Sequence, residues 1–168
     1  MSQYPFIKLV VPTALKAYKN GQLPDSVLAS VKTGGRMHAP AAQQFNKMYD
    51  AATAAGFKLK NVGDYRSFAS QLAMFRDRYV LENTGTGVTR NFEGKTWYLK
   101  KGMAMLATPG KSQHNLGLAV DIANASEKKR INWLIANVEK FGWSWEVVPS
   151  EPWHIRYVLG DKPLPEIA

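Results

Sequence analysis

The sequence contains no cysteine, which excludes disulfide bonds, thiolate catalysis, cysteine-based zinc fingers and iron–sulfur clusters. A transition metal would therefore need histidine and carboxylate ligands. No apolar stretch approaches the roughly 20 residues of a membrane span, so we expect no membrane insertion. The short apolar run at residues 7–11 ends at Pro12, and no small-residue cleavage site follows it. It is not typical of a signal peptide.

Acidic residues are also few, with 13 Asp and Glu against 22 Lys and Arg and a net charge of +9. Such a charge attracts anionic polymers. The basic residues are spread along the chain, and the nearest approach to a run is Lys128, Lys129 and Arg130. Without a compact basic stripe we expect no nucleic-acid partner, whereas a diffuse positive charge suits an anionic cell wall.

The 168 residues, of which 45% are hydrophobic and 21% charged, indicate one globular domain, which we expect to be a monomer. Turn residues dominate 1–35, which predicts an N-terminal arm with one or two short helices, packed on a main body at 36–168. In the first half of that body, the periodicity predicts a helix at 39–55, a strand at 57–65 and a helix from Ser67 to about residue 81.

The second half begins with a glycine-rich connection at 82–111. We expect this connection to be either a functional lid or a disordered insertion. A hairpin around 97–99 lies within it. The remaining pattern predicts a strand at 118–122, a helix from Ser126 to about 141, and strands at 143–148 and 153–158 that pair antiparallel. The fold class is therefore α+β, with a small antiparallel sheet flanked by helices.

Two short segments carry the candidate chemistry. In the first, His114 precedes Asp121 with Gly117 between them, and Asp121 lies in an otherwise apolar run. A carboxylate there needs a positive partner, which is either a metal ion or a basic side chain. In the second, Glu151 precedes His154, and Pro152 places Glu151 on the turn before a strand. The alternative is a surface glutamate followed by a core histidine.

Taken together, His114, Asp121 and His154 supply three ligands, the number expected of a catalytic zinc that keeps one position open. A free carboxylate beside that position is suited to act as a general base. This combination favours a hydrolytic zinc site over a purely structural one. His38 lies before Pro40 in the arm, and we do not expect it to be a ligand.

The pattern S-x-H-x-x-G-x-A-x-D at 112–121, followed by E-P-W-H at 151–154, resembles the D-alanyl-D-alanine carboxypeptidase family of zinc peptidases. This family also includes phage L-alanyl-D-glutamate endolysins. Y-R-S-x-x-x-Q at 65–71 is similar to a further family element. The resemblance covers roughly residues 20–160.

The resemblance implies a role for each matching residue. His114, Asp121 and His154 match the zinc ligands, and Glu151 matches the base that activates water. Arg66 matches the arginine that stabilises the oxyanion. The residues that match substrate-binding positions are Ser112 and Gln71, and Trp153 is expected to wall the cleft beside His154.

The implied function is zinc-dependent hydrolysis of peptidoglycan stem peptides at bonds that involve D-amino acids, by a carboxypeptidase or by an endolysin-type endopeptidase. The apparent lack of a signal favours the endolysin, which stays in the host cytoplasm until its release to the wall. Ser112 and Gln71 favour the carboxypeptidase, which would be secreted or periplasmic. The alternatives from other classes are a silent zinc-containing wall-binding or signalling module and a nucleic-acid-binding domain.

Overall fold

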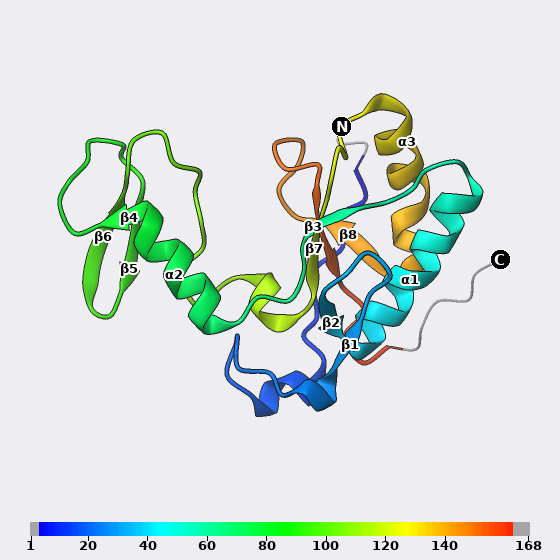
Figure 1. Cartoon of the computed structure of the whole chain (residues 1–168), viewed down its shortest axis with the longest axis horizontal. Helices are drawn as coiled ribbons and strands as arrows, with labels where there is room; N and C mark the ends of the chain where they lie inside the picture. Colours follow the sequence, from blue (N-terminus) through cyan, green and yellow to red (C-terminus); the bar gives the residue numbers. More distant parts are fainter. Residues whose placement is uncertain (1–3, 163–168) are drawn as a thin grey trace.

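A computed structural model describes residues 4–162 of the chain and confirms the α+β class. Its central sheet has four antiparallel strands in the order β3-β7-β9-β8. Two helices, α1 and α3, lie on one side of this sheet (Figure 1). The bounds of these elements are Ala39–Ala54 for α1, Asn61–Gly63 for β3, Ala119–Ile122 for β7, Lys128–Asn137 for α3, Trp143–Trp145 for β8 and His154–Tyr157 for β9.

The strands of the central sheet alternate between two faces, as side chains on a pleated strand must. One face packs into the main hydrophobic core with α1, and its members are Val120, Ile122, Trp143, Trp145, Ile155 and Tyr157. The other face carries polar side chains on the same strands, namely Asp121, Ser144, His154 and Arg156. The alternation therefore places Asp121 and His154, two of the three candidate metal ligands, on the opposite face from the core.

Helix α1 ends where predicted because Gly56, at φ +93°, follows its last turn. Helix α3 begins at Lys128 with Glu127 at the N-cap position, so the predicted cap at Ser126 is wrong. It ends at Asn137, and the 3₁₀ turn η4 (Val138–Phe141) completes the predicted span.

Helix α2 (Phe68–Arg78) is capped by Ser67, whose hydroxyl accepts a hydrogen bond from the Ser70 backbone N–H. It ends before residue 81 because the chain becomes extended and pairs with a second sheet. That sheet has the order β4-β6-β5 and lies at the far end of α2, away from the central sheet (Figure 1). Its strands are β4 (Tyr79–Val80), β5 (Thr89–Phe92) and β6 (Lys95–Leu99).

The second sheet confirms the predicted hairpin within residues 82–111, and the alternative of a disordered insertion is wrong. The strands predicted at 57–65, 143–148 and 153–158 are shorter than expected, because only the residues of β3, β8 and β9 find pairing partners. No helix within residues 4–162 combines the length and the apolar character that crossing a bilayer requires.

The N-terminal part contains two 3₁₀ helices, η1 (Thr13–Ala17) and η2 (Asp25–Val27). A hairpin of β1 (Leu28–Ser30) and β2 (Arg36–His38) follows. Its first strand lies in the predicted arm and its second in the predicted main body. The segment contacts the main core through Leu15 and Leu23. Residues 1–3 of the predicted arm and residues 163–168 of the predicted main body lie outside the described residues.

Candidate metal centre and cleft

His114 is held by a short 3₁₀ helix, η3 (Gln113–Leu116), that leads into β7. The Ser112 hydroxyl accepts a hydrogen bond from the His114 backbone N–H and caps this helix. Gly117 ends it at φ +67°, where an added Cβ would lie 2.7 Å from the backbone nitrogen of His38. The imidazole Nδ1 lies 2.9 Å from the Asp64 carbonyl oxygen. That contact leaves Nε2 of His114 to face Asp121.

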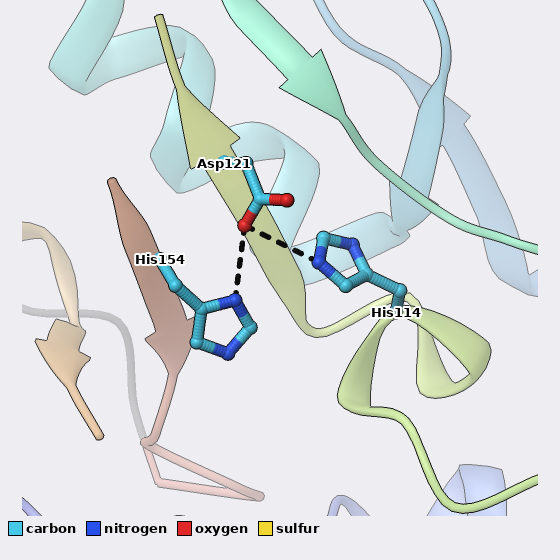
Figure 2. Close-up of side chains that lie close together, drawn as sticks. All are labelled: His114, Asp121 and His154. Carbon is cyan, nitrogen blue, oxygen red and sulfur yellow. Dashed lines mark hydrogen bonds and ion pairs between the residues drawn. The ribbon is translucent and has the colours of Figure 1, made fainter. Parts of the chain in front are cut away.

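Asp121 and His154 face each other across β7 and β9, because the register pairs these two residues directly. Nδ1 of His154 lies 3.0 Å from Oδ1 of Asp121, and Nε2 of His114 lies 3.3 Å from the same oxygen. Figure 2 shows the two rings converging on this carboxylate from different elements. The three candidate ligand atoms all lie within 4.8 Å of one another.

This donor set fits a zinc ion. Ligands at about 2.0–2.1 Å from tetrahedral zinc lie roughly 3.4 Å apart, which is close to the 3.0 and 3.3 Å separations observed. Two imidazoles and one carboxylate also match the ligand types that zinc prefers when cysteine is absent. Among the described residues, these three form the possible zinc site of the chain.

The electrostatics of Asp121 suit a metal ligand. Burial by itself raises the pKa of this carboxyl, but hydrogen bonds from His114 and His154, together with their charge, outweigh burial and hold the pKa well below its ordinary value. The carboxylate therefore remains ionised, as a ligand must be. His38, in contrast, is buried elsewhere and does not join this group.

A cleft of about 820 Å³ opens onto the three ligands. Every residue predicted for the site lines it, so the structure brings together segments that are far apart in sequence. These residues are Arg66, Gln71, Ser112, His114, Asp121, Glu151, Trp153 and His154. Trp153 is 42% exposed at the wall of the cleft, in contrast to the buried Trp143 and Trp145.

Gln71 lines the cleft, and two hydrogen bonds hold its side chain. Its side chain is fully buried. Its amide oxygen accepts a 2.8 Å hydrogen bond from Arg66, and its amide nitrogen donates to the Ala107 carbonyl. These contacts position the Arg66 guanidinium at the cleft. Desolvation by burial lowers the pKa of Arg66, and Asp121 raises it. An arginine remains charged throughout the neutral range.

Sequence reasoning missed a polar group behind His154. Glu146, at the end of β8, approaches Nε2 of His154 at 3.6 Å, and Gln113 approaches the same nitrogen at 3.4 Å. Arg156 lies 4.0 Å from Glu146 on the other side. The predicted antiparallel pairing of 143–148 with 153–158 did not fix the register. In the structure Trp145 lies opposite Ile155, and the next position therefore places Glu146 beside His154.

The fold and the cleft define a small α+β domain built around a candidate mononuclear zinc site. The chain belongs to the VanY family, described as D-alanyl-D-alanine carboxypeptidase, whose model matches residues 34–160. A D-alanyl-D-alanine carboxypeptidase of Enterococcus faecalis (strain ATCC 700802 / V583) is 30% identical over 150 residues, which cover 80% of this chain and 53% of that protein. The chain spans about half the length of the curated relatives it matches.

Solved structures agree with the family assignment. VanYB in complex with D-alanine-D-alanine has a TM-score of 0.56 and 25% identity, covering 78% of this chain and 76% of that one. A vancomycin resistance D,D-pentapeptidase VanY variant in complex with Zn(II) also has a TM-score of 0.56, at 24% identity, covering 81% and 82% of the two chains. At 24% identity, the second of these structures supports the fold alone.

Proposed function

We propose that the chain is a zinc-dependent peptidase that removes a terminal D-alanine from peptidoglycan stem peptides. The observation that carries this proposal is the convergence of His114, Asp121 and His154 at zinc-ligand spacing in a cleft that Glu151 and Arg66 also line. Family membership supports the carboxypeptidase activity and the peptide substrate. The Zn(II) complex of the similar VanY structure supports the metal.

The residues of the cleft have different roles in the proposed reaction. Bound zinc would supply Lewis-acid activation of a water molecule and of the scissile carbonyl. The free carboxylate of Glu151 accepts the proton of the attacking water and returns it to the leaving amine. The Arg66 guanidinium, held by Gln71, donates hydrogen bonds to the oxygen on which negative charge develops.

Removal of a terminal residue, rather than internal cleavage, is supported by cationic side chains in the cleft, which the carboxylates of Asp121, Glu146 and Glu151 also line. Three basic side chains line it, namely Arg66, Arg78 and Lys111. They can attract the terminal carboxylate of a short peptide. A stem peptide that ends in D-Ala-D-Ala carries such a carboxylate next to the reacting amide. The net charge of +9 supports approach to the anionic wall.

The test is product analysis by mass spectrometry after the zinc-loaded chain is incubated with purified muropeptides that end in D-Ala-D-Ala. We expect the loss of one alanine mass, and no loss in the presence of a chelator. Glu151→Gln should lower turnover at least about a hundredfold, as loss of a general base does, while zinc binding is retained. Glu139→Gln, a change at an exposed glutamate outside the cleft, is the matched control.

Each other outcome contradicts part of the proposal. Internal cleavage would indicate an endolysin-type endopeptidase. Bound zinc without any cleavage would indicate a silent wall-binding or signalling module. Unchanged turnover in Glu151→Gln would remove this residue from the reaction, and activity in a metal-free sample would remove zinc from it.

A further inference from the structure

The two candidate histidine ligands differ in how their second ring nitrogen is satisfied. His114 uses Nδ1 for the Asp64 backbone carbonyl, so the main chain fixes its ring. His154 turns the opposite way, because Nδ1 faces Asp121 and Nε2 faces away from it. A ligating imidazole carries its one proton on the nitrogen that does not bind metal, and that N–H needs an acceptor. For His154 the acceptor must come from side chains.

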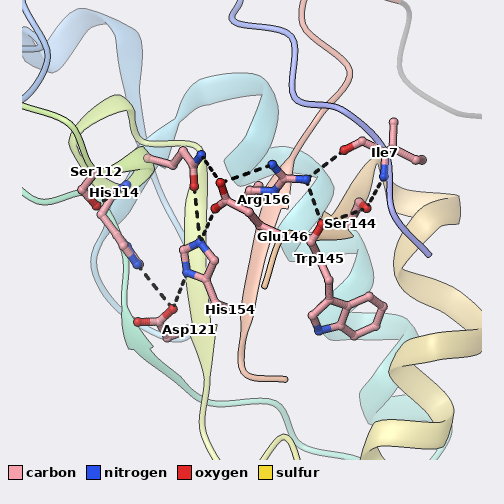
Figure 3. A network of polar contacts seen from close by, with 10 residues as sticks. Ile7, Ser112, His114, Asp121, Ser144, Trp145, Glu146, His154 and Arg156 are labelled. Carbon is pink, nitrogen blue, oxygen red and sulfur yellow. Dashed lines mark hydrogen bonds and ion pairs between the residues drawn. The ribbon is translucent and has the colours of Figure 1, made fainter. Parts of the chain in front are cut away.

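Two side-chain oxygens lie near Nε2 of His154. Figure 3 shows one of them, on Glu146, directed at the His154 ring. Oε1 of Gln113 lies 3.4 Å away and Oε2 of Glu146 lies 3.6 Å away. Both separations exceed those of a well-formed hydrogen bond, so the two oxygens lie at the outer limit of reach of this nitrogen and act on it mainly through their negative charge or dipole. Glu146 also accepts a 3.1 Å hydrogen bond from Nε2 of Gln113.

That bond determines which end of the Gln113 amide meets His154. An ionised carboxylate only accepts hydrogen bonds, whereas an amide both donates and accepts. Glu146 therefore draws the amide nitrogen of Gln113 toward itself and leaves the amide oxygen directed at the imidazole. Without Glu146, the amide of Gln113 could rotate and present its own N–H groups to Nε2 of His154.

Glu146 is itself positioned by a buried arginine. Nη1 of Arg156 lies 4.0 Å from Oε1 of Glu146. Nη2 of Arg156 donates 2.8 Å hydrogen bonds to the carbonyls of Trp145 and Ile7. The Arg156 side chain is only 5% exposed, against 37% for Glu146, so the guanidinium is the fixed member of the pair. Figure 3 shows the polar side chains extending from the N-terminal segment at Ile7 to the metal ligands.

We infer that Glu146 is a positioning residue of the metal centre, which acts with Gln113 on Nε2 of His154 so that Nδ1 is directed at the zinc ion. The inference rests on the proposed zinc dependence. It assigns no contact with substrate to Glu146, so its consequence is zinc affinity and retention rather than a separate chemical step.

The experiment measures zinc affinity of the full chain by competition with a chromophoric chelator. Glu146→Ala should weaken zinc binding by about tenfold to a hundredfold, the usual effect of losing an outer partner of a metal-bound histidine. Glu146→Gln keeps an acceptor at the same place and should recover part of this loss. The visible spectrum of the cobalt-substituted protein should shift in Glu146→Ala, because the field at His154 changes.

Glu151→Gln is the matched control, because it removes one negative charge from the same cleft without touching Nε2 of His154. We expect its zinc affinity to stay within a few-fold of that of the parent. The thermal midpoint of each metal-free variant, measured by circular dichroism, reports whether the fold persists. Glu146 is partly exposed, so its replacement should shift that midpoint little.

Two results would overturn the inference. One is zinc affinity of Glu146→Ala within twofold of the parent, and the other is an equal loss in Glu151→Gln, which would reduce the effect to charge alone. If the parent binds no zinc, the proposed function itself fails. If the parent binds zinc and cleaves muropeptides but Glu146→Ala is unchanged, only this inference fails.

Discussion

At the scale of single residues, the metal centre depends on the glycine at position 63, because a side chain there would crowd two of the candidate ligands. Gly63 on β3 pairs with Asp121 in the sheet register. A Cβ atom added there would lie 3.2 Å from Oδ2 of Asp121 and 3.4 Å from Cε1 of His114. Gly63 is not among the residues with a positive φ, so the requirement for glycine concerns space and not backbone conformation.

Gly63→Ala should therefore displace Asp121 and His114 by a few tenths of an ångström and weaken zinc binding by about tenfold. Chelator competition measures this loss. Asn61→Ala on the same strand is the control, because Asn61 pairs with Ile122 and not with a ligand. Equal affinity in Gly63→Ala and the parent would show that the site absorbs the added methyl group.

His38 is a buried residue whose titration we expect to change the stability of the fold. Burial lowers its pKa below the ordinary value, which is about 6.5. The unfolded chain then binds a proton that the folded chain excludes. The contribution of His38 to stability is therefore complete above the unfolded pKa and is lost as the pH falls below about 6.5 toward the folded pKa.

We expect the free energy of unfolding of the metal-free protein to fall between pH 7.5 and 5.5, and to fall less in His38→Gln. Urea titrations at the two pH values measure this difference. His114 and His154 are unchanged in the variant, so their contribution cancels in the comparison. Identical pH dependence in the parent and the variant would show that His38 does not carry the effect.

At the scale of elements, residues 4–162 contain two hydrophobic cores. The main core lies between the central sheet, α1 and α3. A smaller cluster holds the second sheet against α2, and its buried members are Phe75, Tyr79, Leu99 and Leu106. The rings of Phe75 and Tyr79 stack at a centroid distance of 4.6 Å. The second sheet therefore depends on a cluster separate from the one beneath the metal ligands.

Phe75→Ala should remove about 3–5 kcal/mol of packing from the smaller cluster. We expect faster hydrogen exchange at β5 and β6, with little change at β7 and β9 and with zinc still bound. Phe45→Ala is the matched control, because Phe45 is equally buried in the main core and packs against Trp143. Its exchange should accelerate throughout the central sheet. Uniform acceleration in Phe75→Ala would show that the two cores unfold together.

At the scale of the whole molecule, the candidate ligands join segments that the chain separates. His114 comes from η3, Asp121 from β7 and His154 from β9. A metal held by all three exists only in the folded state, so its binding free energy adds to the free energy of unfolding.

Zinc at about 100 times its dissociation constant should stabilise the fold by roughly 2.7 kcal/mol. For a chain of this size that corresponds to a rise in Tm of about 5–10 °C. Differential scanning calorimetry with zinc and with chelator measures the rise. His114→Ala should lose it, whereas Glu82→Ala, at an exposed site outside the cleft, should keep it. An equal rise in His114→Ala would place the zinc elsewhere.

The sequence by itself determined the features that depend on local rules. The apolar period of α1 and the stop at Gly56 follow from helix geometry. The apolar run around Asp121 marked its carboxylate as a group that needs a positive partner. The spacing of His114 and Asp121 and the E-P-W-H segment marked the candidate site before any pairing was known.

Only the tertiary structure decided what depends on register and on contacts between distant segments. Gln71 is polar and near Arg66 in sequence, but its burial follows from the return of the chain at Ala107. Glu146 gains its place because β8 pairs with β9 and because Ile7 and Trp145 hold Arg156. Such contacts join residues that are far apart in the sequence. Local sequence patterns therefore do not predict them.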